Sequence, residues 1–280
     1  MDVQDQPIGV FDSGVGGLTV AREVLRQLPQ ESVLYLGDTA RVPYGPRGKE
    51  TITRFALEMA EFLLQRRVKA LVIACNTISA TAAEEIRRLS PVPVLDVVNP
   101  TVRAAVAATQ TNVLGVIGTV TTVRSGIYDA LAREIKPQVR VHGQECPLFV
   151  PIAEENLTDH PVAKLMAEEY LQTFRGRDVD ALILGCTHYP LLKRVIGECM
   201  GPGVRLIDSA EPTVSELRAL LAERGLLRRG TPQHQFCVTD ASYKFMQIAN
   251  AILEQDVSSQ VEQVRLGEDH AGWYARSGAA

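Results

Sequence analysis

The sequence lacks long hydrophobic runs and closely paired cysteines. Its apolar runs, such as those around Leu71 and Leu182, are far too short to cross a bilayer. Its five cysteines include no CxxC spacing, and an odd number in a chain of 280 residues argues against a disulfide framework. The polar N-terminal residues Met1–Gln6 carry no secretory signal. We therefore expect reduced thiols, a cytoplasmic location and no membrane partner.

The sequence also lacks any block of charge of one sign. The formal net charge is −4, and the acidic and basic residues are well mixed along the chain. Without a basic stretch, a nucleic-acid partner is not expected. The apolar fraction of 46% is sufficient for one large domain or two modest ones, each with its own core.

Short apolar runs alternate with stretches that have helical periodicity. This alternation predicts an α/β protein with mainly parallel sheets covered on both faces, and ligands in such sheets bind at the C-terminal ends of the strands. The predicted strands are Ile8–Phe11, Val33–Leu36, Leu71–Ala74, Val94–Leu95, Val113–Ile117, Val139–Val141, Leu182–Gly185, Val204–Ile207 and Phe236–Val238. The predicted helices include Glu50–Arg67, Thr101–Ala108, Arg124–Ile135, Val162–Phe174 and Thr213–Arg224.

An internal repeat indicates two related halves. Three pairs of segments match in the same order and at nearly the same offset, which is unusual for chance similarity. A single doubly wound sheet is the alternative. The pairs are Ala70–Thr77 with Ala181–His188, Asp96–Val102 with Asp208–Val214, and Ile8–Ser13 with Leu114–Thr119.

The repeat predicts two pseudo-symmetric domains with a site in the cleft between them. In the matching segments Asp96–Val102 and Asp208–Val214, a proline follows an extended link, where it is suited to begin a helix. We expect the chain to enter the second half near Asn99 and to return near Ala210. The first domain then comprises residues 1–98 and 210–280, and the second comprises residues 99–209.

A glycine-rich segment, Asp12–Gly17, follows the first predicted strand and opens a helix. Glycines let a backbone approach a ligand, and a helix N-terminus favours an anion. A dinucleotide fingerprint needs a third glycine where this chain has Thr19, although Asp38 could serve as the ribose-binding acid. Because Asp12 would repel a pyrophosphate, it suits an ammonium group or a proton-transfer network better.

Cys75 and Cys186 each end an apolar run and precede small polar residues. A single cysteine in this position is more often a buried apolar residue. Zinc binding is one alternative, but zinc usually needs about four ligands, and these segments offer fewer. Acyl transfer by Cys186 with His188 is another alternative, but it leaves Cys75 unexplained. Two thiols facing one carbon acid can invert it, one sulfur taking a proton and the other giving one. Candidate assistants are Asp12, Glu154 and His188.

Two further segments have both a plain interpretation and a functional one, and the C-terminal segment has only a plain one. Pro43–Pro46 is a turn by composition, and its backbone N–H groups could bind a carboxylate. Thr119 and Thr122 can cap a helix or donate hydroxyl groups to a ligand. The segment Gly267–Ala280 is predicted to be a poorly ordered tail.

The chain resembles the glutamate racemases of the cofactor-independent aspartate/glutamate racemase superfamily. The resemblance runs from about Pro7 to about Leu253. It departs from the family pattern at Thr121 and Asn156, where the family often has glycine. The motifs that carry it are Ile8–Leu18, Leu36–Gly45, Ala74–Thr77 and Gly185–Pro190.

The resemblance implies a fold of two pseudo-symmetric domains and specific residue roles. Cys75 would act on D-glutamate with help from Asp12, and Cys186 would act on L-glutamate with help from Glu154 and His188. No cofactor or metal is implied, a homodimer is expected, and D-glutamate would feed peptidoglycan synthesis. A sibling racemase for aspartate or a hydantoin, or a two-lobed small-molecule binding protein, remains an alternative. The implied substrate-binding residues are Asp12, Ser13, Pro43, Tyr44, Gly45, Asn76, Thr77, Thr119, Thr122, Thr187 and His188.

Overall fold

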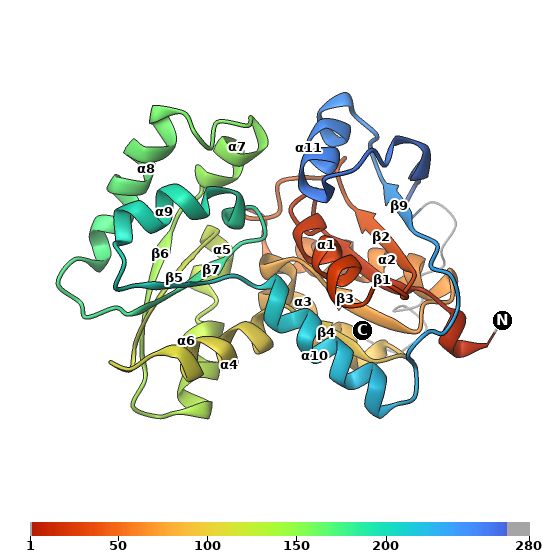
Figure 1. The fold of residues 1–280 in the computed structure, drawn as a ribbon, viewed down its shortest axis with the longest axis horizontal. Helices are drawn as coiled ribbons and strands as arrows, with labels where there is room; N and C mark the ends of the chain where they lie inside the picture. The colour runs from red at the N-terminus through yellow and green to blue at the C-terminus, as the bar shows by residue number, and fades with distance from the viewer. Residues whose placement is uncertain (1, 268–280) are drawn as a thin grey trace.

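The chain folds into two α/β lobes that lie side by side (Figure 1). The computed structural model describes residues 2–267. The tail predicted for residues 267–280 therefore lies, except for Gly267, outside the described residues.

The first lobe is built on a six-stranded sheet among the described residues, in the order β10-β9-β2-β1-β3-β4, and every pair in it is parallel. Helices α1, α10 and α11 cover one face, and α2 and α3 cover the other. The strands are β1 (Ile8–Asp12), β2 (Val33–Gly37), β3 (Ala70–Ile73), β4 (Val94–Asp96), β9 (Gln235–Val238) and β10 (Val261–Gln263). The helices are α1 (Leu18–Gln27), α2 (Lys49–Gln65), α3 (Asn76–Leu89), α10 (Ala210–Glu223) and α11 (Tyr243–Leu253).

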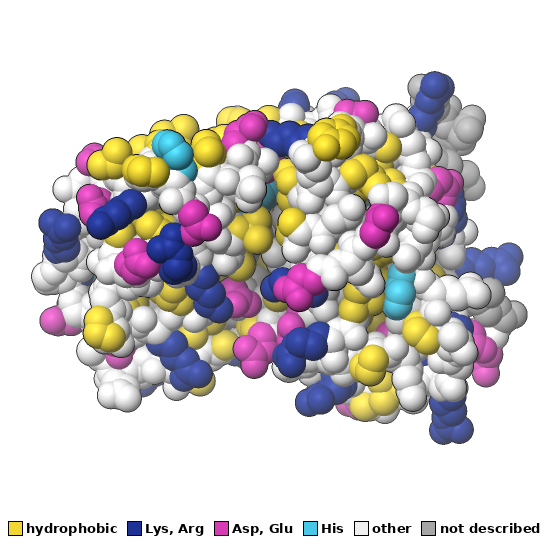
Figure 2. Space-filling model, turned by 45° about the horizontal axis from the view of Figure 1, so that its top comes forward, with side chains coloured by type: hydrophobic (Ala, Val, Ile, Leu, Met, Phe, Trp, Pro, Cys, Tyr) yellow, Lys and Arg dark blue, Asp and Glu magenta, His cyan; other side chains and the backbone are white. Residues whose placement is uncertain are grey.

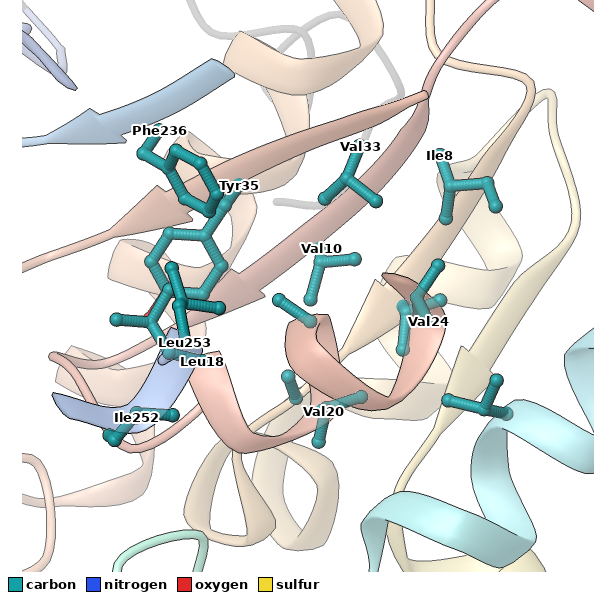
Figure 3. Close-up of a cluster of buried hydrophobic side chains, with 14 of the residues drawn as sticks. Ile8, Val10, Leu18, Val20, Val24, Val33, Tyr35, Phe236, Ile252 and Leu253 are labelled. Carbon is teal, nitrogen blue, oxygen red and sulfur yellow. The ribbon is translucent and has the colours of Figure 1, made fainter. Parts of the chain in front are cut away.

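Alternation along the central strands divides the core of this lobe into two layers. Ile8 and Val10 of β1 point to the same face as Tyr35 of β2, where α1 and α11 pack over them (Figure 3). Phe11 and Leu36 point to the opposite face and pack under α2 and α3. Because both faces of the sheet are covered, β1 and β2 are buried along their whole length, as expected for parallel strands.

The second lobe repeats this arrangement with a four-stranded sheet among the described residues, in the order β6-β5-β7-β8. All of its pairs are parallel. Helices α7, α8 and α9 cover one face, and α4 and α6 cover the other. The strands are β5 (Val113–Gly118), β6 (Arg140–Glu145), β7 (Ala181–Gly185) and β8 (Arg205–Ile207). The helices are α4 (Val98–Ala108), α5 (Val120–Arg124), α6 (Ile127–Ile135), α7 (Phe149–Glu154), α8 (Pro161–Leu171) and α9 (Lys193–Met200).

The two sheets share one strand order. Strands β2-β1-β3-β4 of the first lobe correspond in order to β6-β5-β7-β8 of the second, and β9 and β10 extend only the first sheet. The strands that precede the two cysteine motifs, β3 and β7, occupy equivalent central positions. The predicted α/β class with parallel sheets is confirmed, and the topology agrees with the internal repeat.

The two repeated Pro-Thr-Val segments lie where the chain crosses between the lobes. The Oδ1 atom of Asp96 accepts hydrogen bonds from the backbone N–H groups of Val98 and Asn99, at 2.7 and 3.0 Å. Asp208 accepts one from Ala210 in the same way, at 3.1 Å. The aspartates thus begin α4 and α10, and the prolines fall within the first turn rather than at its start. The domain boundaries at residues 98 and 210 stay a prediction.

One predicted helix is broken in the structure. The stretch predicted as a single helix over residues 124–135 contains the end of α5 and all of α6. Gly126 separates them, with φ of 68° in the left-handed region that glycine adopts readily. Strand β10 was not predicted, because three residues at a sheet edge are too few for a periodic pattern.

The viewed surface in Figure 2 carries Lys and Arg side chains interspersed with Asp and Glu. Within residues 2–267, no helix combines the length and the apolar character needed to cross a membrane.

Candidate active site

The central strands of each lobe deliver the candidate residues to one region between the lobes. Strands β1 and β3 are neighbours with Phe11 paired to Ile73, so Asp12 and Cys75 leave adjacent strand ends. In the second lobe Gly118 pairs with Gly185, so Thr119 and Cys186 leave adjacent strand ends as well.

A cavity of about 370 Å³ lies between these strand ends. Its volume is at the small end of the usual range for ligand pockets. Six of its lining residues were not among the predicted catalytic or substrate-binding residues, and they give part of the wall an apolar character: Val42, Pro46, Val120, Pro147, Val150 and Pro151. The predicted residues that line it are Ser13, Pro43, Tyr44, Gly45, Cys75, Asn76, Thr77, Thr119, Glu154, Cys186, Thr187 and His188.

Asp12 and Thr122 are the predicted site residues that lie behind this lining. Asp12 is 1% exposed and Thr122 is fully buried, and both contact residues of the wall or of the adjoining loop. A larger open groove, of about 950 Å³, lies at the opposite ends of the strands and holds neither cysteine. Among residues 2–267 no cluster of three or more His, Cys, Asp or Glu side chains is arranged to hold a metal ion.

Cys75 is buried and lies near the acidic side chain of Asp12. Its Sγ lies 3.5 Å from the Oγ of Ser13, and its side chain is buried. Burial, reinforced by the charge of Asp12, raises the pKa of the Cys75 thiol to about 12. Burial also raises the pKa of Asp12 itself, against the opposing charge of His188 and a hydrogen bond from the Gly14 N–H at 3.0 Å. Cys75 is therefore a neutral thiol near pH 7.

Cys186 has a different partner. Its Sγ lies 3.7 Å from Nδ1 of His188, whose Nε2 lies 3.2 Å from Oε1 of Glu154. Burial by itself lowers the pKa of His188, but its hydrogen bonds to Cys186 and Glu154 outweigh that effect and raise the pKa to about 10. Burial likewise raises the pKa of Glu154, and the contact with His188 reverses it to a net lowering. Near pH 7 this side holds an imidazolium paired with a carboxylate.

Three threonine hydroxyls meet at the junction of the lobes. Thr77 follows Cys75 in the first lobe, whereas Thr119 and Thr122 belong to the second. The Oγ1 atom of Thr119 lies 3.0 Å from that of Thr77 and 2.9 Å from that of Thr122. Thr119 also caps α5, so the capping interpretation holds for it. Its place on the cavity wall leaves the ligand-binding interpretation open, because a hydroxyl can both accept and donate.

The glycine-rich segment serves the contact between the lobes. A Cβ on Gly16 would lie 2.5 Å from Oγ1 of Thr187 and 2.6 Å from Nδ1 of His188. A Cβ on Gly17 would lie 2.4 Å from Cβ of Asp12. Gly16 thus lets the first lobe approach the Cys-Thr-His motif of the second lobe closely, whereas Gly17 makes room for Asp12 within the first lobe.

Asp38 and Tyr44 bond to each other inside the first lobe. The Tyr44 hydroxyl donates to Asp38, which also accepts from Arg41 at 2.6 Å and from Thr239 at 2.9 Å. With its carboxylate engaged in this way, Asp38 is not free to bind a ribose. Tyr44 lines the cavity with its hydroxyl already occupied, so the backbone of the Tyr44–Gly45 turn is the part left for a ligand.

Two departures from the expected family pattern have a local structural explanation. Thr121 donates through its Oγ1 to the carbonyl of Gly45 at 2.7 Å, which joins the two lobes beside the cavity. Asn156 adopts φ of 56°, a left-handed conformation that asparagine tolerates better than most residues in place of glycine.

The structure also reveals contacts that were not predicted. Tyr128 and Ser209 both accept hydrogen bonds from the side chain of Asn76. Ser209 lies in the repeated segment Asp208–Val214, so the repeat could have indicated its importance. Tyr128 lies on an ordinary amphipathic helix, and nothing in the sequence marks it.

A small cavity lined by one thiol from each of two related lobes is typical of a two-lobed α/β enzyme that acts on small molecules. Residues 8–217 match the model of the Asp/Glu/Hydantoin racemase family. The chain is 48% identical over 262 residues to the glutamate racemase of Syntrophus aciditrophicus (strain SB), covering 93% of this chain and 97% of that protein.

Solved structures of glutamate racemases have the same fold as this chain. The crystal structure of a glutamate racemase isoform from Bacillus anthracis superposes with a TM-score of 0.90 at 41% identity, covering 94% of this chain and 98% of that one. The glutamate racemase of Francisella tularensis, solved with D-glutamate, gives a TM-score of 0.89 at 38% identity over the same shares. The chain belongs to the Asp/Glu/Hydantoin racemase family, and it is an isomerase. The resemblance found in the sequence is thereby confirmed.

Proposed function

We propose that this protein interconverts L- and D-glutamate by a two-base mechanism in which Cys75 and Cys186 exchange protons with opposite faces of the substrate. The observation that carries the proposal is the pair of thiols, one from each lobe, on the wall of a single cavity. The names of the relatives support glutamate as the substrate, and the Francisella tularensis enzyme was solved with D-glutamate.

In the L-to-D direction, Cys186 as a thiolate removes the α-proton. The C–H bond breaks as an S–H bond forms, and the electron pair stays on the substrate carbon and its carboxylate. Cys75 then gives its thiol proton to the other face, which forms D-glutamate and leaves a thiolate on Cys75. A neutral Cys75, with a pKa raised to about 12 by burial and by Asp12, is in the correct state to donate.

In the reverse direction Cys75 must lose its proton first. Asp12 is the group placed to influence this step, because it lies on the adjacent strand end. On the other side the His188 imidazolium, paired with Glu154, can return a proton to the Cys186 sulfur 3.7 Å away. A cysteine sulfur is therefore the acid and base on both faces, but Asp12 neighbours one sulfur, and His188 with Glu154 neighbours the other.

The polar wall suits an amino acid with two carboxylates. Ser13, the Thr77–Thr119 hydroxyl pair and the Tyr44–Gly45 turn offer donors for carboxylates, and Asn76 offers its Oδ1 for the ammonium group. Thr187 adds a hydroxyl on the Cys186 side. In bacteria the product D-glutamate would supply peptidoglycan synthesis. The expected homodimer and cytoplasmic location stay predictions.

The first test is racemisation itself. Circular dichroism should decay to zero from either enantiomer of glutamate in the absence of added pyridoxal phosphate, metal or nucleotide. Aspartate and a hydantoin, run in parallel, test the sibling activities. Stable optical activity of glutamate in the presence of a folded protein would exclude the proposal, and it would support the binding-protein alternative if glutamate still bound.

The second test separates the two bases. Cys75→Ser should stop solvent deuterium from entering D-glutamate, and Cys186→Ser should stop it from entering L-glutamate. Cys199→Ser is the matched control, because Cys199 lies outside the cavity. Equal and mild effects of the two cavity variants would contradict the two-base mechanism.

A further inference from the structure

Tyr128 of α6 connects the two cysteine motifs. It is 3% exposed, and its hydroxyl accepts a hydrogen bond from Nδ2 of Asn76 at 2.8 Å. Asn76 directly follows Cys75 and is the first residue of α3. A side chain of the second lobe therefore holds the residue next to the thiol of the first lobe.

The same hydroxyl lies against the other cysteine motif. A Cβ on Gly185, which directly precedes Cys186, would lie 3.3 Å from the hydroxyl oxygen of Tyr128 and 2.7 Å from the carbonyl of Ile117. The absence of a side chain at Gly185 leaves room for the Tyr128 hydroxyl beside β7. One buried oxygen thus lies between the residue after Cys75 and the residue before Cys186.

Ser209 accepts a second hydrogen bond from the side-chain amide of Asn76. Nδ2 of Asn76 also donates to Oγ of Ser209 at 3.2 Å, and Ser209 precedes α10 in the segment where the chain returns to the first lobe. Both N–H bonds of the Asn76 amide are used in this way. Its Oδ1 has no hydrogen-bond partner within residues 2–267, and Asn76 lines the cavity. The amide is therefore held in one orientation by groups that lie outside the cavity lining.

We propose that Tyr128 is a positioning residue that sets the spacing of Cys75 and Cys186 across the cavity, and that Ser209 assists by fixing the Asn76 amide. This inference rests on the proposed racemase function for its kinetic consequences. Tyr128 acts through Asn76 and the Gly185 backbone.

The electrostatic setting agrees with a positioning role. Burial raises the pKa of Tyr128 above its usual value. The hydrogen bond from Asn76 opposes this shift, and negative charge on Asp96, then on Cys186 and Cys75, adds to it. The phenol therefore stays protonated whichever cysteine is the thiolate. It keeps one hydrogen-bonding state through both half-reactions, as a spacer between two bases of changing charge must.

The decisive variant is Tyr128→Phe, which keeps the ring and removes only the hydroxyl. Because misplacement of reacting groups by up to 1 Å can cost about 100-fold in rate, we expect kcat to fall by about 10- to 100-fold in both directions, with a smaller change in KM. The primary isotope effect with α-deuterated glutamate should rise, since proton transfer becomes slower. Ser209→Ala should have a weaker effect of the same kind.

Tyr170→Phe is the matched control. Tyr170 is a partly buried tyrosine of the same lobe, and its hydroxyl accepts from the Leu148 N–H at 3.3 Å without reaching the first lobe. We expect its kinetic constants and isotope effect to match those of the wild-type protein. A purely structural role for Tyr128 would reduce the folded fraction and leave KM, kcat per folded molecule and the isotope effect unchanged, which would overturn the proposal.

A second measurement does not depend on activity. In NMR spectra of the wild-type protein the side-chain amide protons of Asn76 should exchange slowly with solvent, and Tyr128→Phe should accelerate that exchange while Tyr170→Phe does not. If the wild-type protein fails to racemise glutamate but this pattern holds, the proposed function fails and the hold on Asn76 stands. Unchanged exchange in folded Tyr128→Phe would refute the positioning role.

Discussion

Replacing Gly16 by alanine should impair catalysis more than it impairs folding. Gly16 does not adopt a positive φ, so alanine is compatible with its backbone conformation. The added methyl group would instead meet the second lobe, 2.5 Å from Oγ1 of Thr187 and 2.6 Å from Nδ1 of His188. The change therefore tests whether close approach of the lobes is needed at this point.

The size of the effect follows from these distances. Ordinary contact begins at 3.4 Å, so the His188 ring or the Gly16 segment must move by about 0.8 Å. Overpacking of this kind costs about 1–3 kcal/mol, and a glycine-to-alanine change returns about 0.4–1 kcal/mol through the unfolded chain. We expect a loss of stability of at most about 2–3 kcal/mol. A shift approaching 1 Å at His188, which contacts Cys186, should lower kcat by about 10- to 100-fold.

Circular dichroism measures both quantities, in the far ultraviolet for unfolding and on glutamate for racemisation. Gly203→Ala is the control, because a Cβ there has nothing within 4 Å. Since the clash is on the Cys186 side, exchange of the α-proton of L-glutamate should suffer first. A Gly16→Ala protein with wild-type kcat and wild-type stability would refute the reasoning that the glycine maintains contact between the lobes.

Further predictions concern the imidazole pair, the contact between the lobes and a buried ion pair. The pKa of His188 is raised from 6.5 to about 10, so between these pH values the folded protein binds more protons than the unfolded chain. The stabilisation by His188 is therefore complete below pH 6.5 and is lost as the pH rises towards 10. The free energy of unfolding should fall by up to about 1.4 kcal/mol per pH unit in this range. Denaturant titrations should show this slope, and His188→Asn should flatten it; an equal slope in both proteins would contradict the assignment. Thr121→Val removes the 2.7 Å bond to the Gly45 carbonyl and should raise KM about two- to tenfold in steady-state kinetics, with kcat little changed; an unchanged KM would count against a role for this contact in holding the cavity wall. Lys69→Met leaves the buried carboxylate of Glu31 without the ammonium group now 2.5 Å away, and should lower the free energy of unfolding by about 3–5 kcal/mol in urea titrations. Its kcat per folded molecule should not change, because the pair lies at the start of β3, far from the thiols.

Much of the fold could be predicted because its signals are local. Buried parallel strands are short, continuous apolar runs, and β1, β3 and β7 stand out for that reason. The break at Gly126 and the edge strand β10 were missed, since a single glycine or three residues carry too little pattern.

The candidate site was predictable to the extent that it follows strand ends. Cys75 and Cys186 could each be placed at the C-terminal edge of a parallel sheet, and the internal repeat assigned them to equivalent positions of two halves that share a cleft. Tyr128 could not be found in this way, because its importance lies in a hydroxyl that reaches another lobe. Thr121 looked like a local departure from a family pattern, and only the three-dimensional arrangement shows that it contacts Gly45.

The two thiols occupy equivalent positions in equivalent folds, yet their surroundings differ in charge. Burial and Asp12 keep Cys75 protonated, whereas Cys186 faces an imidazolium that Glu154 holds in place. Strict symmetry would give both sulfurs the same protonation state, and two thiols or two thiolates cannot invert a carbon, since one must accept as the other donates. In the proposed mechanism, the duplicated backbone places one sulfur on each lobe, and the neighbours that differ in charge distinguish the two sulfurs. A variant in which both cysteines have the same charged neighbours should therefore lose racemase activity, even though both sulfurs remain.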